Sequence, residues 1–152
     1  MDSTRKRINE LAPCGVYCGA CPSFNKSCKG CSADSTQQKR QSKYGCAIRS
    51  CCYNEKHLSF CIDCPLFPCS KFKKKLLSTH KTDPRYAYRH EIPAVFKKLK
   101  DMGLDGFLNW QKKRWKCPNC GHTIYFYHYK CSHCSYGKTV YSIFLYSSGQ
   151  IF

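Results

Sequence analysis

Apolar side chains recur at helical intervals in the stretch that ends near residue 116. Positions i, i+3, i+4, i+7 and i+11 are held by Leu104, Phe107, Leu108, Gln111 and Trp115. Four of these five are apolar, and the spacing places all five on one face of a helix. We therefore expect a helix from about residue 104 to pack this face into a core.

Capping residues mark three earlier helix starts. Ser70 can cap a first helix, and Asp83 followed by Pro84 forms the N-cap and N1 pair of a second. Pro93 begins a third helix, which Gly103 is placed to end. The apolar positions of the first helix are Phe72, Leu76 and Leu77. Those of the third are Val95, Phe96, Leu99 and Met102.

A different pattern follows residue 116. The run TIYFYHYK is β-branched and aromatic and holds no Gly or Pro, so it predicts a strand. Strand alternation would place Tyr125, Tyr127 and Tyr129 on one face, and Ile124 and Phe126 on the other. We expect the Ile/Phe face to pack against the helices. The run KTVYSIFLY predicts another strand.

Cysteine is unusually frequent, with 15 of the 152 residues, and this indicates disulfides or bound metal. The stretch MDSTRKRINELAP lacks the apolar segment of a secretory signal, and no run of about eighteen apolar residues predicts a transmembrane helix. In a reducing cytoplasm, paired cysteines are metal ligands rather than half-cystines. We therefore predict a cytoplasmic metalloprotein with no membrane partner.

Two C-x2-C pairs bracket the strand predicted after residue 116. They are Cys117 with Cys120 and Cys131 with Cys134, in the pattern C-x2-C-x10-C-x2-C. Each pair has the spacing at which one turn presents both sulfurs to one ion, and the interval suits a short hairpin. The pattern predicts a zinc ribbon closed by four thiolates. Because a ribbon so small buries little apolar surface, the metal would supply much of its folding energy.

Eleven further cysteines lie in the first 70 residues, most of them beside Gly or Pro, which allow tight metal-binding turns. The ten predicted ligands are Cys14, Cys18, Cys21, Cys28, Cys31, Cys46, Cys51, Cys61, Cys64 and Cys69. The C-x2-C pairs are the first candidates for two four-cysteine sites. Cys46 and Cys51 can complete the site of Cys28 and Cys31, while Cys14 and Cys69 can serve the other pairs.

The sequence leaves open both the pairing of these ten thiols and the metal that they bind. Soft thiolates take zinc, which would give two or three Zn²⁺ in the whole chain. They also take a [4Fe–4S] cluster, which is the alternative cofactor for these cysteine-rich first 70 residues, here called the head.

Basic residues outnumber acidic ones by 26 to 9, for a formal net charge of +17. Residues 71–116 hold fourteen basic and four acidic residues, so most of this excess falls on the helical segment. Twelve thiolates on three zinc ions would still leave about +11. The charge favours RNA or DNA as a partner, bound through KFKKKLL, QKKRWK and the tyrosine face. A protein partner and a merely solvated surface are the alternatives, and the oligomeric state is left open.

No catalytic motif accompanies the cysteines. The chain lacks a Ser/His/Asp order, an H-E-x-x-H motif and a Gly-rich phosphate loop. Four-thiolate sites are closed, and the neighbouring His122 and His133 are predicted not to be ligands. The sequence therefore does not predict an enzyme, although Cys69 next to Lys71, or Cys51 near Arg49, would be a reactive thiol if the basic neighbour lowered its pKa.

The motifs CGVYCGACP, CKGC, CAIRSC, CIDCPLFPC and WKCPNCG together resemble the prokaryotic family called domain of unknown function 3795. The resemblance covers the head and extends through GLDGFLNWQKKRWKC into the predicted ribbon. It implies an intracellular bacterial or archaeal protein whose head cysteines belong to one recurring framework. Cys52 is extra to that framework, so we leave it out of the ligand set.

These patterns predict a small, metal-stabilised α+β protein in three parts. They are a cysteine-rich metal-binding head (1–70), a basic helical segment (71–116) and a zinc ribbon (117–152). The predicted function is a zinc-binding module with structural four-cysteine sites that binds nucleic acid or a protein. The alternatives are an iron–sulfur redox protein that uses the head, and a metal-sensing or metal-handling protein with spare cysteines as a labile site.

Overall fold

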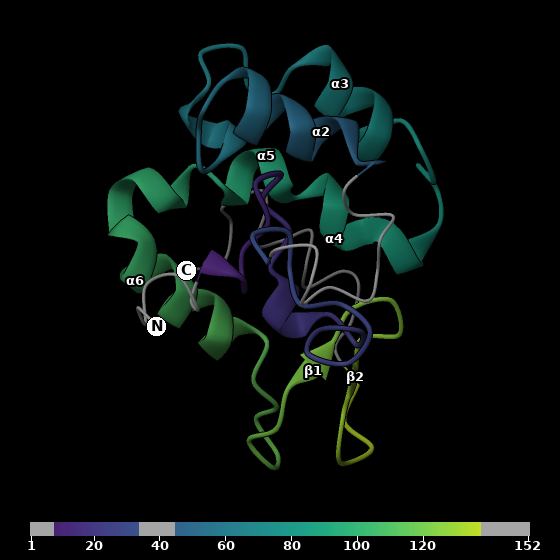
Figure 1. Ribbon diagram of the computed structural model, residues 1–152. Helices are drawn as coiled ribbons and strands as arrows, with labels where there is room; N and C mark the ends of the chain where they lie inside the picture. Colours follow the sequence, from purple (N-terminus) through teal and green to yellow (C-terminus); the bar gives the residue numbers. More distant parts are fainter. Residues whose placement is uncertain (1–7, 34–44, 138–152) are drawn as a thin grey trace. The chain divides into compact units, whose positions relative to one another are not determined.

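Short helices and one small hairpin make up the computed structural model of the chain, which describes residues 8–33 and 45–137 (Figure 1). The chain divides into two compact units, Met1–Lys75 and Leu76–Phe152. Helices together with a two-stranded sheet confirm the mixture of α and β structure that the sequence predicts. Within the described residues, no helix has the length and apolar character needed to cross a bilayer.

The first unit consists of single helical turns joined by loops. Its elements are η1 (Cys18–Ala20), α2 (Ala47–Ser50), η3 (Cys51–Glu55), η4 (Cys61–Asp63), α3 (Ser70–Phe72) and η5 (Lys73–Leu77), the last of which crosses the boundary of the unit. The 3₁₀ turns η1 and η4 each carry a C-x2-C pair. The N–H of Cys21 donates to the Cys18 carbonyl, and that of Cys64 donates to the Cys61 carbonyl, both at 2.9 Å. Each pair is therefore held by a hydrogen-bonded turn.

Thiols take part in the small apolar core of this unit. Cys18 and Cys31 are buried together with Ala12, and Cys14 and Phe24 pack against them. A protonated cysteine behaves as a small apolar residue, so it can fill such positions. The core of the first unit thus rests on residues that are also candidate metal ligands.

The start of α3 differs from the prediction. Cys69, in an extended conformation, is the N-cap and makes no side-chain capping hydrogen bond, and Ser70 is already the first helical residue. The predicted capping role of Ser70 is therefore wrong, because the helix begins one residue earlier than a Ser70 cap requires. Phe72 and Leu76 are buried, in agreement with the apolar positions predicted for this helix.

The helices of the second unit are η6 (Pro84–Tyr86), α4 (Ala87–His90), α5 (Ile92–Val95) and α6 (Lys98–Arg114). Asp83 is the N-cap of η6, and its carboxylate accepts the N–H of Arg85 at 3.0 Å, which confirms the predicted cap. Gly103 interrupts α6 with φ 73° and ψ 169°, a conformation that favours glycine. One helix therefore ends and another begins at this residue, as the sequence predicts.

The apolar faces predicted for these helices are largely buried. The buried positions are Val95, Phe96, Leu99, Phe107, Leu108, Gln111 and Trp115. Leu104 is half-buried, whereas Met102, next to the break at Gly103, is 39% exposed. The predicted core stripe of α6 is thus confirmed, and the face of the preceding helix is confirmed except at Met102.

The run TIYFYHYK forms a hairpin rather than one strand. Its strands are β1 (Ile124–Tyr125) and β2 (Lys130–Cys131), which pair antiparallel (Figure 1). The residues between them form the turn, in which Tyr127 and Tyr129 have positive φ values of 78° and 55°. Because the turn breaks the alternation of side chains, the predicted tyrosine face is wrong. The run KTVYSIFLY lies outside the described residues.

Instead of forming an open face, Tyr129 joins an aromatic core within the second unit. The rings of Tyr88 and Phe126 stack with centroids 4.0 Å apart, and the Trp115 ring lies 6.1 Å from Phe126 and 6.2 Å from Tyr129. The Tyr129 hydroxyl donates to the Arg85 carbonyl at 3.1 Å and accepts the N–H of Tyr88 at 3.3 Å. These contacts attach the hairpin to the helices of its own unit.

A buried ion pair stabilises the same unit. The Arg114 guanidinium contacts the Glu91 carboxylate, and less than a tenth of either residue is exposed. Arg114 also donates to the Gln111 side-chain oxygen at 3.2 Å, and its guanidinium lies 5.4 Å from the centre of the Trp110 ring. Because both charges have lost their hydration, removal of one would leave the other uncompensated.

Replacement of Arg114 by methionine is expected to lower the free energy of unfolding by about 3–5 kcal/mol, since it leaves the Glu91 carboxylate buried without its partner. Urea denaturation measures this change. The control is Lys113→Met at the neighbouring exposed position, for which we expect a change within about 0.5 kcal/mol. Equal stability of the two variants would show that the ion pair is not part of the core.

Candidate metal centre

The four cysteines around the hairpin converge on one point. The sulfurs of Cys117, Cys120, Cys131 and Cys134 all lie within 4.8 Å of one another. The Sγ atoms of Cys117 and Cys134 are 3.5 Å apart, and those of Cys120 and Cys131 are 3.4 Å apart. The structure therefore brings together all four residues that the sequence predicts for this site. We call them the four-cysteine cluster.

Backbone hydrogen bonds around each pair hold the sulfurs in place. The N–H of Gly121, at a positive φ of 83°, donates to the Cys117 carbonyl at 2.9 Å, so the first pair lies on a closed turn. In the second pair, the N–H groups of His133 and Cys134 lie 3.4 and 3.5 Å from the Cys131 sulfur. N–H groups aimed at a sulfur stabilise its thiolate form, which is the form that binds metal.

The hydrogen bonds also favour the thiolate of Cys134. The backbone N–H of Tyr136 and then the Asn119 amide, which lies 3.6 Å from the sulfur, lower the pKa of Cys134 to about 6. A thiol with this pKa is mostly ionised at neutral pH. At least one ligand of the cluster is thus prepared to bind a cation without first losing a proton.

The arrangement fits a single tetrahedral ion. Zinc–sulfur bonds of about 2.3 Å place neighbouring sulfurs of a tetrahedral site about 3.8 Å apart. The observed separations of 3.5 and 3.4 Å lie close to this value. His122 and His133 stack on one another with ring centroids 4.2 Å apart, and neither belongs to the cluster. The cluster can therefore hold a metal ion through sulfur alone.

The predicted ligands of the head are arranged differently. Of the described residues, only the four-cysteine cluster brings three or more ligand atoms within 4.8 Å of one another. The ten predicted head ligands are all described, and none of them forms a disulfide. Their assignment to metal sites remains a prediction.

One head thiol has a partner that sequence adjacency does not reveal. The Lys75 ammonium lies 3.0 Å from the Cys46 sulfur, although 29 residues separate them. Burial raises the pKa of the Cys46 thiol, but the hydrogen bond and charge of Lys75, together with the backbone N–H groups of Arg49 and Ile48, outweigh burial and lower that pKa below its ordinary value. The reactive-thiol criterion is therefore met at Cys46 by a residue distant in the sequence.

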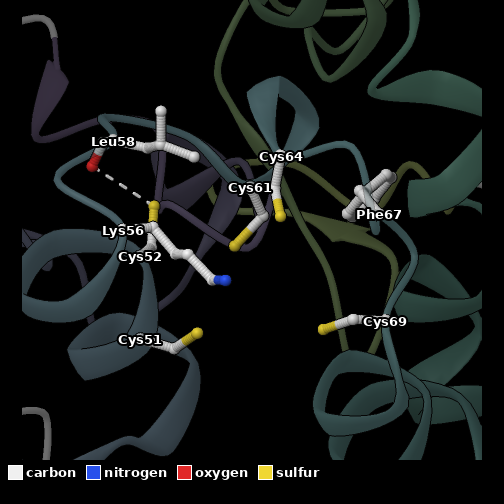
Figure 2. Close-up of a pocket in the computed structure, with 8 residues that line it drawn as sticks. All are labelled: Cys51, Cys52, Lys56, Leu58, Cys61, Cys64, Phe67 and Cys69. Carbon is white, nitrogen blue, oxygen red and sulfur yellow. Dashed lines mark hydrogen bonds between the residues drawn. The ribbon is translucent and has the colours of Figure 1, made fainter.

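Five other head cysteines line one pocket (Figure 2). The lining residues are Cys51, Cys52, Lys56, Leu58, Cys61, Cys64, Phe67 and Cys69. Cys52, which the sequence analysis sets apart, is thus a wall residue of this pocket, and its thiol donates to the Leu58 carbonyl at 3.3 Å. A hydrogen bond with Cys52 and then burial raise the pKa of the Cys61 thiol. Metal binding here would have to displace at least one proton.

Comparison with known proteins bears on the head alone. Residues 23–74 match the family described as Protein of unknown function (DUF3795). The head resembles this family. The match confirms the resemblance predicted from the sequence, but it spans about a third of the chain and does not reach the four-cysteine cluster. No curated protein and no solved structure matches the chain.

Replacement of Cys131 by serine is expected to remove about one equivalent of bound metal per chain, because the buried sulfur cannot be replaced by a neighbouring donor. The measurement is metal content by mass spectrometry after exhaustive dialysis. Ser132→Ala, at the exposed next residue, is the matched control and should retain the metal. Loss of metal from both variants, or from neither, would contradict the assignment of the site.

Proposed function

We propose that the protein is a structural zinc-binding protein and that its C-terminal segment is a zinc ribbon. The observation that carries this proposal is the convergence of four sulfurs within 4.8 Å. Soft thiolates in a tetrahedral set are typical ligands of zinc, and four of them leave no position for water or substrate. The ion therefore acts on the fold rather than on a substrate.

The size of the hairpin explains why a metal is needed. Its strands are two residues long, and a hairpin of this length is marginally stable in water. The ion would join the turn before β1 to the turn after β2, so that both ends of the hairpin are fixed at one point. Metal binding and folding of this segment are then one process, in which those thiols that still carry protons release them to the solvent.

Zinc rather than iron is expected at this site. Protein purified without oxygen should contain one zinc that is lost in Cys131→Ser and retained in Ser132→Ala. Elemental analysis of the two variants measures their zinc and iron content directly. Iron in place of zinc, lost together with Cys131, would overturn the proposed metal while leaving the site itself intact.

Nucleic-acid binding is the second function that we propose, and exposed lysines support it. Three exposed lysines lie near the C-terminal end of α6: Lys112 and Lys113 in its last turn, and Lys116 just beyond it. They form no ion pair with the described residues, and residues 117–152 contain no Asp or Glu. A phosphate backbone would meet positive charge that no ion pair neutralises.

The aromatic contribution to this interface is smaller than the sequence suggests. Tyr129 is buried, and the Tyr127 ring packs edge-on to Tyr86 and Tyr88 with centroids 5.8 and 5.5 Å away. These rings are engaged within the unit and do not form a free stacking row. We therefore expect binding to depend on phosphate contacts, with little preference for base sequence.

The double substitution Lys112→Gln/Lys113→Gln is expected to weaken binding to a random single-stranded RNA. Because each lost phosphate contact removes about 0.7 from the slope of log K against log salt, that slope should fall by about 1.4. Fluorescence anisotropy at several salt concentrations measures both effects.

The matched control for this experiment is Lys26→Gln/Lys81→Gln, which removes the same charge from two exposed positions elsewhere. It should leave the affinity nearly unchanged. If the two double variants bind equally, net charge rather than a surface at the end of α6 governs the interaction. Absence of salt-dependent binding by the unaltered protein would contradict the second function.

A further inference from the structure

The pocket of the head differs from the four-cysteine cluster in the number and spacing of its sulfurs. Five cysteines from three separate segments line it: the start of η3, the turn η4, and the N-cap of α3. Leu58 and Phe67 supply apolar walls. Apolar side chains such as Leu58 and Phe67 would suffice to pack this wall, so the five thiols suggest that the pocket binds a ligand.

Four of the five sulfurs are directed toward a common space. Figure 2 shows the sulfurs of Cys51, Cys61, Cys64 and Cys69 around the opening, with Cys51 and Cys69 on opposite sides of it. All four residues are only partly buried, so the opening is reachable from outside. The cavity measures about 30 Å³, so an organic substrate does not fit, and an inorganic cluster would have to move these partly exposed side chains outward to enter.

Cys52 differs from these four cysteines. It is 2% exposed, and its thiol donates a hydrogen bond to the Leu58 carbonyl. Its sulfur is thus turned toward the backbone of the wall and away from the opening that the other four sulfurs surround. The structure thus separates four candidate ligands from one supporting cysteine.

The spacing of the four sulfurs distinguishes two kinds of metal centre. A single tetrahedral ion needs sulfurs about 3.8 Å apart. No three ligand atoms of the described head residues lie within 4.8 Å of one another, in contrast to the four-cysteine cluster. A polynuclear cluster binds each thiolate to a different metal atom, so its ligand sulfurs stand further apart.

We propose that this pocket binds a [4Fe–4S] cluster through Cys51, Cys61, Cys64 and Cys69, with Cys52 outside the ligand set. Each of the four thiols loses its proton to solvent and binds one iron of the cluster. No ligand is shared with the zinc ribbon, so this proposal and the proposed function can fail independently.

The charges near the pocket fit an anionic centre. Four thiolates on an iron–sulfur core leave a net negative charge. Lys56 lines the pocket, and the charges of Lys71 and Lys56 act on the Cys51 thiol, although burial and a hydrogen bond with Glu55 outweigh them and raise its pKa. Lys71 itself forms an exposed ion pair with Glu55 at 3.5 Å, so Lys56 is the cation that lines the pocket. These cations would offset the charge of the cluster and limit the desolvation cost of its burial.

The experiment is anaerobic purification of the full chain followed by assays of iron, acid-labile sulfide and zinc, with a visible absorption spectrum. We expect a brown protein with about four iron and four sulfide per chain. The Cys61→Ser variant should lose the iron, the sulfide and the colour while its zinc remains. Cys52→Ser should retain all of them, and Cys131→Ser should lose zinc and retain iron.

Several outcomes would overturn the inference. They are a colourless protein without sulfide, iron bound without sulfide, and zinc that is lost on Cys61→Ser. Equal loss of cluster from Cys52→Ser and Cys61→Ser would overturn the ligand set. If Cys61→Ser does not fold, Cys69→Ser gives the same comparison, and the sulfide content of the unaltered protein decides the question without any variant.

Discussion

Thiolates that lie less than 4 Å apart repel one another strongly, so they must either take up protons or share a cation. This constraint governs the C-terminal part of the chain, where four sulfurs converge within 4.8 Å. Hydrogen bonds to the sulfurs of Cys131 and Cys134 favour the ionised forms, which increases the need for a cation. The backbone turns thus place the sulfurs where a bound ion would make the arrangement favourable with all four thiols ionised.

The aromatic core of the second unit is linked to the four-cysteine cluster along the chain. Trp115 stands two residues before Cys117, and Tyr129 stands two residues before Cys131, so the residues of the aromatic core alternate with the ligands along the chain. An ion that fixes the sulfurs also fixes these rings against Tyr88 and the helices of the unit. Metal binding and aromatic packing would therefore stabilise each other, and the hairpin needs both because its strands are so short.

Local signals in the sequence predict the features that depend on neighbouring residues. The cap at Asp83, the break at Gly103 and the buried stripe of α6 each follow from residues a few positions apart, as does the four-cysteine cluster. Features that depend on a positive φ at a residue other than glycine, or on distant contacts, are not predicted. Tyr127 and Tyr129 turn the chain in a run without glycine, and Lys75 reaches Cys46 across 29 residues. The pocket around Cys61 likewise collects residues whose spacing does not reveal their proximity.

Hydrogen exchange before and after removal of the metal tests the central claim most directly. The amides of Ile124 and Cys131, which donate to the carbonyls of Trp115 and Tyr136, report on the hairpin between the two cysteine pairs. If the ion holds this segment, a strong chelator under reducing conditions should abolish the protection of both amides, and returned zinc should restore it. Protection that persists with all four thiols free of metal would show that packing alone holds the hairpin, and would contradict the account.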